Sequence, residues 1–162
     1  MHIRHAVPAD LPAMEEIYAQ ARAYMAAHGN PTQWGTTHPK REWLEADMVR
    51  GESYVCEEDG QVVATFMLST AGEPTYAYIE DGGWPDEEPY GVIHRIATGG
   101  ARKGAGAFCI RWCLEQCGSV RIDTHDDNRP MQALLDKLGF AYCGRIYVED
   151  GTPRRAYCRR RD

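Results

Sequence analysis

The chain has 162 residues, a length that predicts one domain able to bury most of its apolar surface. Apolar residues make up 43% and charged residues 26%, as in ordinary globular proteins, and no run approaches the roughly 18 apolar residues that span a membrane. The net charge of −6 argues against nucleic acid as the main partner. The first residues lack the apolar core of a signal peptide, so we expect a cytoplasmic protein.

Hydrophobic spacing and turn residues predict the elements of this domain. Asp10 is the expected N-cap of the first helix, and aspartate–glycine pairs mark two hairpin turns, at 59–60 and 150–151. The acidic stretch 71–89 is expected to be a loop with a strand fragment at 77–79. The order predicts an α/β domain with a mixed sheet. The predicted elements are a strand at 2–7, helices at 8–29 and 40–51, a hairpin at 53–70, a strand at 90–98, a helix opened by Gly104 and Gly106, a strand at 119–125, a helix at 128–139 and a hairpin at 140–160.

The six cysteines show no zinc-like CxxC spacing, and in a reducing compartment they are expected to be free thiols. Cys109, Cys113 and Cys117 recur every four residues and therefore share one helix face. That pattern favours a buried stripe of small apolar side chains over a metal site, so no metal is predicted.

A glycine-rich segment, TGGARKG, begins where the strand at 90–98 ends and runs to Gly104, which together with Gly106 opens the next helix. Glycine is costly inside a helix, so two at its start suggest close approach to a ligand. A P-loop is excluded because this segment lacks the lysine and the serine or threonine of that motif. A dinucleotide fingerprint is weakly matched because Cys109 replaces its third glycine. Free amides at a helix start suit a pyrophosphate, although a tight structural turn is the alternative.

With its context, this segment resembles the acyl-CoA motif of the GCN5-related N-acetyltransferase (GNAT) family. IATGGARKGAG matches the strand end and glycine loop, and NRPMQALLDKLGF matches the family's second motif. The resemblance spans essentially the whole chain. It implies a single GNAT-like domain over residues 1–162, with a central mixed, mostly antiparallel sheet that contains a splayed parallel strand pair and is flanked by helices. It also implies acetyl-CoA as the cosubstrate.

The resemblance assigns cofactor contacts residue by residue. The backbone of Ile96 and Thr98 would pair with the pantetheine arm, and Asn128 would bond the pantetheine, cap its helix or do both. Two positions depart from the family pattern: Ala101 stands where arginine or glutamine is usual, and Leu135 replaces the tyrosine taken as the acid that protonates the leaving sulfur. The amides expected to hold the pyrophosphate are those of Arg102, Lys103, Gly104, Ala105, Gly106 and Ala107.

A protonated amine acceptor requires a base or a water relay. The resemblance implies that the base lies on the strand leading into the glycine loop, on the face that carries the acyl group. Strand alternation places His94 on the same face as Ile96, so His94 is the first candidate, with a purely structural histidine as the alternative. A bulge in the strand would exchange His94 for Arg95. His125 is the second candidate, because Asp123 and Asp126 flank it and either would raise its basicity.

The acceptor side is predicted from exposed aromatic and acidic residues. Trp34 and Trp84 lie in glycine- and proline-rich loops and are candidate pocket walls, with local packing as the alternative. Glu80 and its acidic loop would attract a cationic amine, or are simply solvated, and alternation places Tyr90 on the face of His94.

The sequence therefore predicts an acetyl-CoA-dependent N-acetyltransferase that acts on a primary amine of a small molecule or peptide by direct attack in a ternary complex. The alternative is a catalytically silent acyl-CoA-binding regulatory module, which Leu135 supports. No nucleic acid or membrane partner is expected, and a homodimer is considered. The acceptor's identity and the length of the acyl group stay open.

Overall fold

A computed structural model describes residues 1–100 and 102–162 of the chain. The order of helices and strands agrees with the order predicted from the sequence. The elements are β1 (His2–His5), η1 (Pro8–Asp10), α1 (Leu11–Ala27), α2 (Arg41–Val49), β2 (Ser53–Glu58), β3 (Gln61–Ser69), η2 (Pro74–Tyr76), β4 (Gly91–Thr98), α3 (Ala105–Cys117), β5 (Ser119–Thr124), α4 (Arg129–Lys137), β6 (Ala141–Tyr147) and β7 (Pro153–Arg160), where η denotes a 3-10 helix.

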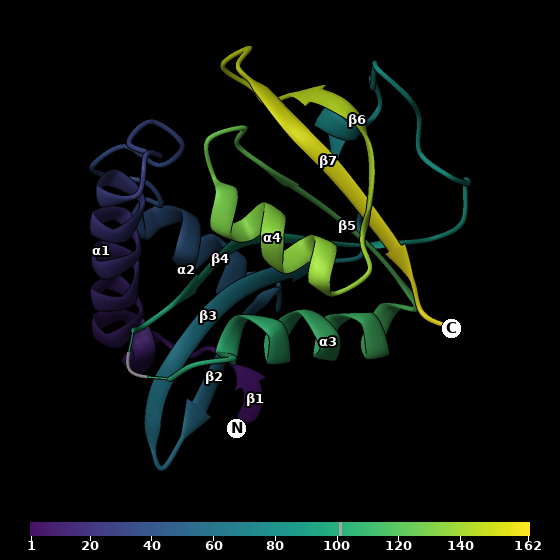
Figure 1. Cartoon of the computed structure of the whole chain (residues 1–162). Coiled ribbons are helices and arrows are strands. Elements are labelled where there is room, and N and C mark those ends of the chain that lie inside the picture. Colours follow the sequence, from purple (N-terminus) through teal and green to yellow (C-terminus); the bar gives the residue numbers. More distant parts are fainter. Residues whose placement is uncertain (101) are drawn as a thin grey trace. The chain divides into compact units, whose positions relative to one another are not determined.

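The strands form one mixed sheet in the order β1-β2-β3-β4-β5-β7-β6 (Figure 1). The pairs β1–β2, β2–β3, β5–β7 and β6–β7 are antiparallel, and β4 pairs with β5 in parallel. The parallel register joins only two residue pairs, Gly91 with Val120 and Val92 with Arg121. A parallel ladder that ends after two pairs is what a splayed strand pair requires. The predicted fold class is thus confirmed.

Residue contacts group the chain into two compact units, which we describe separately. The first unit contains Met1–Leu68 and Ile93–Trp112, and the second contains Ser69–Val92 and Cys113–Asp162. No helix in the described residues is long and apolar enough to cross a membrane.

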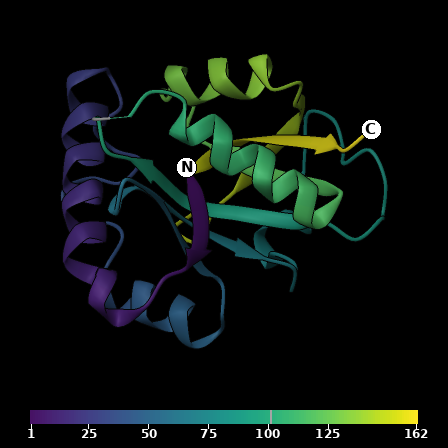
Figure 2. The same ribbon diagram turned by 90° about the horizontal axis from the view of Figure 1, so that it is seen from below.

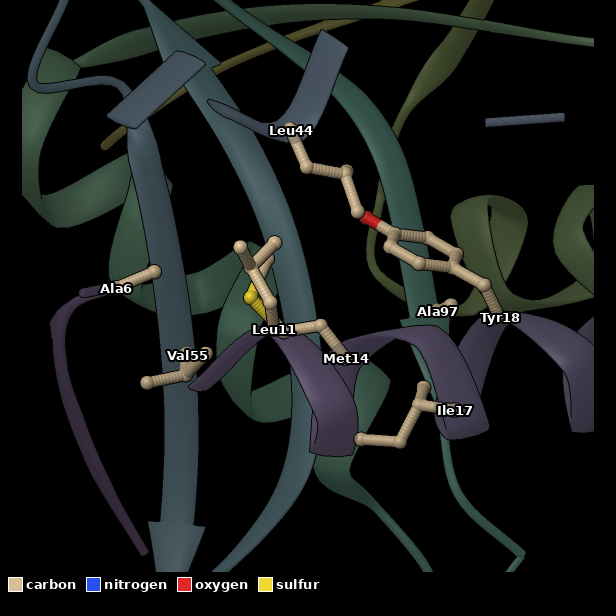
Figure 3. Close-up of a cluster of buried hydrophobic side chains, with 8 residues drawn as sticks. All are labelled: Ala6, Leu11, Met14, Ile17, Tyr18, Leu44, Val55 and Ala97. Carbon is tan, nitrogen blue, oxygen red and sulfur yellow. The ribbon is translucent and has the colours of Figure 1, made fainter. Parts of the chain in front are cut away.

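The first unit places helices on both faces of its strands (Figures 1 and 2). Residues of α1 at helical spacing pack against Val55 of β2 and Ala97 of β4. Trp112 of α3 contacts the rings of Tyr54 and Phe66. Because Tyr54 and Val55 are neighbours in one strand and point to opposite faces, α1 and α3 cover opposite sides of it. The core on the α1 side, shown in Figure 3, consists of Ala6, Leu11, Met14, Ile17, Tyr18, Leu44, Val55 and Ala97.

The second unit has its own apolar core, in which Tyr76, Val92, Ile146 and Ala156 are buried. The strand fragment expected at 77–79 is wrong. Residues Pro74–Tyr76 form a 3-10 helix, and Glu80 alone makes a bridge, to Arg145. The reason is local, since Ala77 ends that 3-10 helix with the helical dihedrals φ −66° and ψ −34°, so an extended strand cannot begin there.

Two turn and cap predictions have different outcomes. The hairpin turn at Asp59 and Gly60 is confirmed, because both residues have the positive φ of a two-residue type I′ turn, 52° and 77°. Asp10 precedes α1 as predicted, but its carboxylate makes no cap bond to that helix. It accepts the Val7 amide at 2.8 Å and pairs with Arg4, also at 2.8 Å, so it closes the preceding 3-10 turn instead.

Candidate functional site

The glycine segment has the geometry of an anion-binding helix start. Gly104 adopts φ +82°, a conformation that favours glycine, and α3 begins at the next residue. The amide of Phe108 donates to the carbonyl of Gly104 at 3.0 Å, closing the first helical turn. The amides at positions 105–107 therefore have no acceptor within the helix. Free amides at the positive end of the helix dipole can bind phosphate oxygens.

The preceding residues fix where this helix start lies. The Gly99 amide donates to the Val63 carbonyl at 3.0 Å, which ties the end of β4 to β3. A Cβ at Gly99 would meet the side chains of Gln20 and Ile17 of α1 at 3.5 and 3.7 Å. Gly99 therefore also serves close packing, in line with the structural alternative for that one glycine. Ala101, the first departure from the family pattern, lies outside the described residues.

The two basic residues of the segment differ in their surroundings. The guanidinium of Arg102 forms an ion pair with the carboxylate of Glu58 at the end of β2. Lys103 is exposed. Glu58 was not identified from the sequence, and its charge offsets part of the positive potential expected from Arg102. Lys103 is therefore the stronger candidate of the two for direct attraction of a phosphate.

The side chains of β4 do not alternate regularly between the two faces of the sheet near His94, the candidate base. Arg95 has φ +54°, in the left-handed region, so the pattern that placed His94 and Ile96 on one face is interrupted between them. The guanidinium of Arg95 binds the buried carboxylate of Asp47 at 2.8 and 2.9 Å. A guanidinium carries hydrogen-bond donors and no acceptor, so Arg95 offers no alternative base. His94 is half-buried, and Thr98 is exposed at the strand's end.

Asn128 is the N-cap of α4. Its Oδ1 accepts the Met131 amide at 3.2 Å, and the side chain is buried. The capping interpretation is thus confirmed, while the bond to pantetheine stays a prediction. Leu135, in the same helix, is fully buried, so an apolar side chain fills the position of the family's tyrosine.

His125 follows β5, and its ring already has a local partner. Its Nδ1 accepts the Asp127 amide at 3.0 Å, so in the neutral ring the hydrogen resides on Nε2. The two carboxylates expected to act on this ring bind other groups. Asp123 accepts the Tyr76 hydroxyl at 2.7 Å, and Asp126 pairs with Arg145 at 3.1 Å. The neutral His125 is therefore arranged to donate a hydrogen bond from Nε2 rather than to accept a proton there.

Glu80 is a surface carboxylate held between two tyrosines. Tyr78 donates its hydroxyl to one carboxylate oxygen at 2.9 Å, and Tyr147 donates to the other. These two hydrogen bonds, the one from Tyr147 foremost, lower the pKa of Glu80 below its ordinary value of 4.5. The backbone of Glu80 exchanges two hydrogen bonds with Arg145, at 3.0 and 2.8 Å. The negative charge is thus fixed in place on the surface of the second unit.

The aromatic residues of the acidic loop surround an arginine that sequence reasoning missed. The guanidinium of Arg121, on β5, lies 3.9 Å from the ring centroid of Tyr90 and 4.4 Å from that of Trp84. It also donates to the Asp86 carbonyl at 2.8 Å. Trp84 donates its Nε1 hydrogen to the Tyr76 carbonyl at 2.9 Å. The contacts of Trp84 therefore support the packing interpretation. The sequence does hold an indication of them, because an arginine between Val120 and Ile122 in a buried strand needs partners inside the protein.

Trp34 lies in the first unit. Its ring contacts Tyr18 edge-on, with centroids 5.6 Å apart, and it packs against the core on the α1 side. It is half-buried, so part of the ring stays accessible. All six cysteines are free, with Cys109 and Cys113 buried as the apolar stripe requires. Among the described residues, no three side chains form a group that could hold a metal.

The glycine segment, the short parallel ladder and the capped α4 agree with a comparison against known families. The family model described as "Acetyltransferase (GNAT) family" matches residues 13–140. The chain belongs to the GNAT family. Among the curated proteins, none matches this sequence.

Solved structures support the same family. A GNAT-family acetyltransferase from Streptococcus agalactiae is 29% identical, with a TM-score of 0.89 over 99% of this chain and 95% of that one. Ribosomal-protein-alanine N-acetyltransferase from Brucella melitensis is 22% identical, with a TM-score of 0.65 over 99% and 100%. The protein yncA from Salmonella typhimurium, solved with its cofactor acetyl-CoA, is 18% identical, with a TM-score of 0.64 over 99% and 94%. At these lower identities, the last two show the shared fold alone.

Proposed function

We propose that this GNAT protein is an acetyl-CoA-dependent N-acetyltransferase that acetylates a primary amine of a small molecule or peptide by direct attack in a ternary complex. The observation that carries the proposal is the start of α3. There, a left-handed Gly104 precedes three amides without helical acceptors, beside the exposed Lys103. Apart from its two chain neighbours, no atom of the described residues lies within 4 Å of a Cβ added at Gly104, so these residues leave the backbone open to a ligand at this point. These features fit a pyrophosphate.

Each remaining contact is assigned from the family resemblance. The amides of residues 102–107 would hold the pyrophosphate, and the backbone of Ile96 and Thr98 would align the pantetheine arm. Besides the Oδ1 that caps α4, the Asn128 side chain carries an NH2 group, which would face the end of the pantetheine arm that carries the thioester. When bound, acetyl-CoA supplies an activated acetyl group as a thioester.

His94 and water are assigned to the proton movements, and His125 stays the second candidate base. His94 would accept a proton from the acceptor's ammonium group, leaving a neutral amine to attack the acetyl carbon. The carbon–sulfur bond then breaks, and the amine's remaining extra proton passes from the product amide to water. The sulfur departs as a thiolate with a pKa of about 8.5, which near neutral pH takes up a proton from water. With Leu135 at the tyrosine position, no acid from α4 is required.

The acceptor is assigned to the fixed charge and aromatic surfaces. The carboxylate of Glu80 stays ionised through the hydrogen bonds of Tyr78 and Tyr147, so it would attract a cationic amine. Trp34 would contribute an aromatic wall. Trp84 and Tyr90 would act through the conformation of the acidic loop, since both rings pack on Arg121.

The test combines binding with turnover. Calorimetry should show acetyl-CoA bound with a Kd on the order of micromolar, and CoA should be released with at least one member of a panel of primary amines, amino acids and peptides. Competition with longer acyl-CoA compounds would define the acyl group. The silent-module alternative predicts the same binding with no CoA release for any amine. It would win outright if Leu135→Tyr alone created activity.

A further inference from the structure

The kink of β4 at Arg95 stands out in a strand that is otherwise extended. A positive φ is uncommon for residues other than glycine, and it persists only where surrounding contacts hold it. Here it lies between His94 and Ile96, the candidate base and the candidate acyl-aligning residue. What holds this conformation therefore bears on the reaction.

Two contacts hold Arg95, one to its side chain and one to its backbone carbonyl. Its guanidinium makes a two-pronged ion pair with Asp47 of α2, which is only 2% exposed. Its carbonyl accepts the hydroxyl hydrogen of Tyr18 of α1 at 2.7 Å. Burial raises the pKa of Tyr18, so this hydroxyl remains a donor. Both contacts lie within the first unit.

We propose that Asp47 and Tyr18 clamp Arg95 in its left-handed conformation, and that these three are positioning residues for acetyl transfer. The clamp fixes the direction of the backbone and side chains on either side of the kink, at His94 and Ile96. This inference rests on the proposed function for its catalytic consequence, but the clamp itself is a property of the free protein.

The clamp also contacts Trp34, the residue proposed as an aromatic wall of the acceptor site. The ring of Tyr18, whose hydroxyl binds Arg95, contacts the ring of Trp34 edge-on. A change at Trp34 is therefore two contacts away from the kink in β4. The clamp thus connects the loop that would contact the acceptor with the strand that would orient the acyl group.

The experiment compares alanine with glycine at position 95. Both are made with Asp47→Asn, so that the buried side chain carries no charge once its Arg95 partner is removed. Arg95→Ala should relax toward an extended φ and lower kcat by about tenfold, with the Kd of acetyl-CoA changed less than about twofold. Arg95→Gly should keep the left-handed φ without steric cost and retain kcat within about threefold of the native value.

The sign of this comparison is diagnostic. In an ordinary strand, glycine is the more damaging of the two, because it loses more conformational freedom on folding. Equal kcat values, or a lower kcat for the glycine variant, would overturn the proposal. The matched control is Arg50→Ala, because Arg50 also pairs with Asp47 but is half exposed and lies on the α2 side. We expect that variant to keep its native kcat.

Two further measurements keep the proposal testable if the double variants fold poorly. Tyr18→Phe preserves the ring and removes only the hydroxyl, and it should lower kcat by about threefold with little change in KM for acetyl-CoA. The amide–α-proton coupling of residue 95, measured by NMR on the free protein, should be small in the native chain and larger after Arg95→Ala. A large native coupling would contradict the clamp. A native protein with the small coupling but no turnover for any amine would contradict the proposed function alone.

Discussion

The start of α3 and the acidic loop at 80–90 are candidate ligand sites of different construction. At the start of α3, the donors are backbone amides, and a Cβ at Gly104 would meet no atom within 4 Å in the described part of the chain beyond its two neighbours. In the acidic loop, the groups are side chains that already bind one another or other parts of the second unit, as Glu80 binds Tyr78 and Tyr147. The first region can receive an anion with its groups in place, while the second presents a charge whose position depends on several partners.

This difference determines how each region should respond to substitution. A backbone site is insensitive to most side-chain changes and is disrupted by any change that alters φ or fills the approach path. A side-chain site loses its function in steps, as each hydrogen bond or charge is removed. Substitutions should therefore give an all-or-none loss at Gly104 and a graded loss at Glu80.

Gly104→Val gives the largest expected effect. A β-branched residue is strongly disfavoured at φ +82°, so the start of α3 would rearrange and its amides would no longer converge on a phosphate. We expect no acetyl-CoA binding by calorimetry up to about 1 mM ligand.

The matched control for this prediction is Gly118→Val. Gly118 follows the other end of α3, has φ +73°, and also has no atom within 4 Å of an added Cβ. The two variants should lose similar stability, but the control should bind acetyl-CoA normally. If both bind alike, the start of α3 is not the pyrophosphate site.

The same difference explains how much could be predicted from the sequence. Turns and helix caps depend on residue types that are adjacent in sequence. The glycine segment, the turn at Asp59 and Gly60 and the cap at Asn128 could therefore all be identified from short stretches of the chain. Element order followed from hydrophobic period for the same reason. The strand fragment expected at 77–79 was wrong because the 3-10 helix at Pro74–Tyr76 carries helical dihedrals into Ala77, and so short a helix has no hydrophobic period in the sequence.

Side-chain partners that are distant in sequence could not be predicted. Glu58 with Arg102, Asp47 with Arg95 and Tyr147 with Glu80 are each more than 40 residues apart. Nothing in one segment specifies the other before the chain folds. Flanking in sequence likewise does not determine which way a carboxylate points once a strand has ended, as Asp123 accepts the Tyr76 hydroxyl and Asp126 pairs with Arg145.

His94→Ala should give the next largest effect and would extend the comparison to the strand between these regions. If His94 removes the acceptor's proton, turnover should fall by roughly a hundredfold at neutral pH, with acetyl-CoA affinity unchanged. The defect should shrink as pH rises toward the amine's pKa of about 10.4, because the free amine then forms without help. Rates for both proteins across pH with one identified acceptor provide the measurement.

Two companions separate chemistry from position at His94. His94→Gln retains hydrogen bonding but cannot take a proton, so it should be as slow as the alanine variant. His28→Ala, at the exposed end of α1, should retain native turnover. A constant loss at every pH would indicate positioning, and an unchanged rate would remove His94 from the mechanism in favour of a water relay.

Glu80→Gln should give the smallest effect and tests the graded behaviour of the acidic loop. The amide preserves the shape of the side chain but can accept only one of the two tyrosine hydroxyls, so the charge and one hydrogen bond are lost. For a cationic acceptor, KM should rise by about tenfold with kcat nearly unchanged, and the difference should narrow at high salt. Glu88→Gln removes the same charge from an exposed position in the same loop and should leave KM within about twofold of native.

Because the tyrosine hydroxyls lower the pKa of Glu80, the native protein should keep its low KM as pH falls to 4.5, the ordinary value for a glutamate. Tyr147→Phe removes the larger of the two effects, so the rise in KM should then begin at a higher pH. Equal KM values for Glu80→Gln and the native protein with every cationic acceptor would exclude Glu80 from acceptor recognition and leave its tyrosines as a structural tie between the loop and β6.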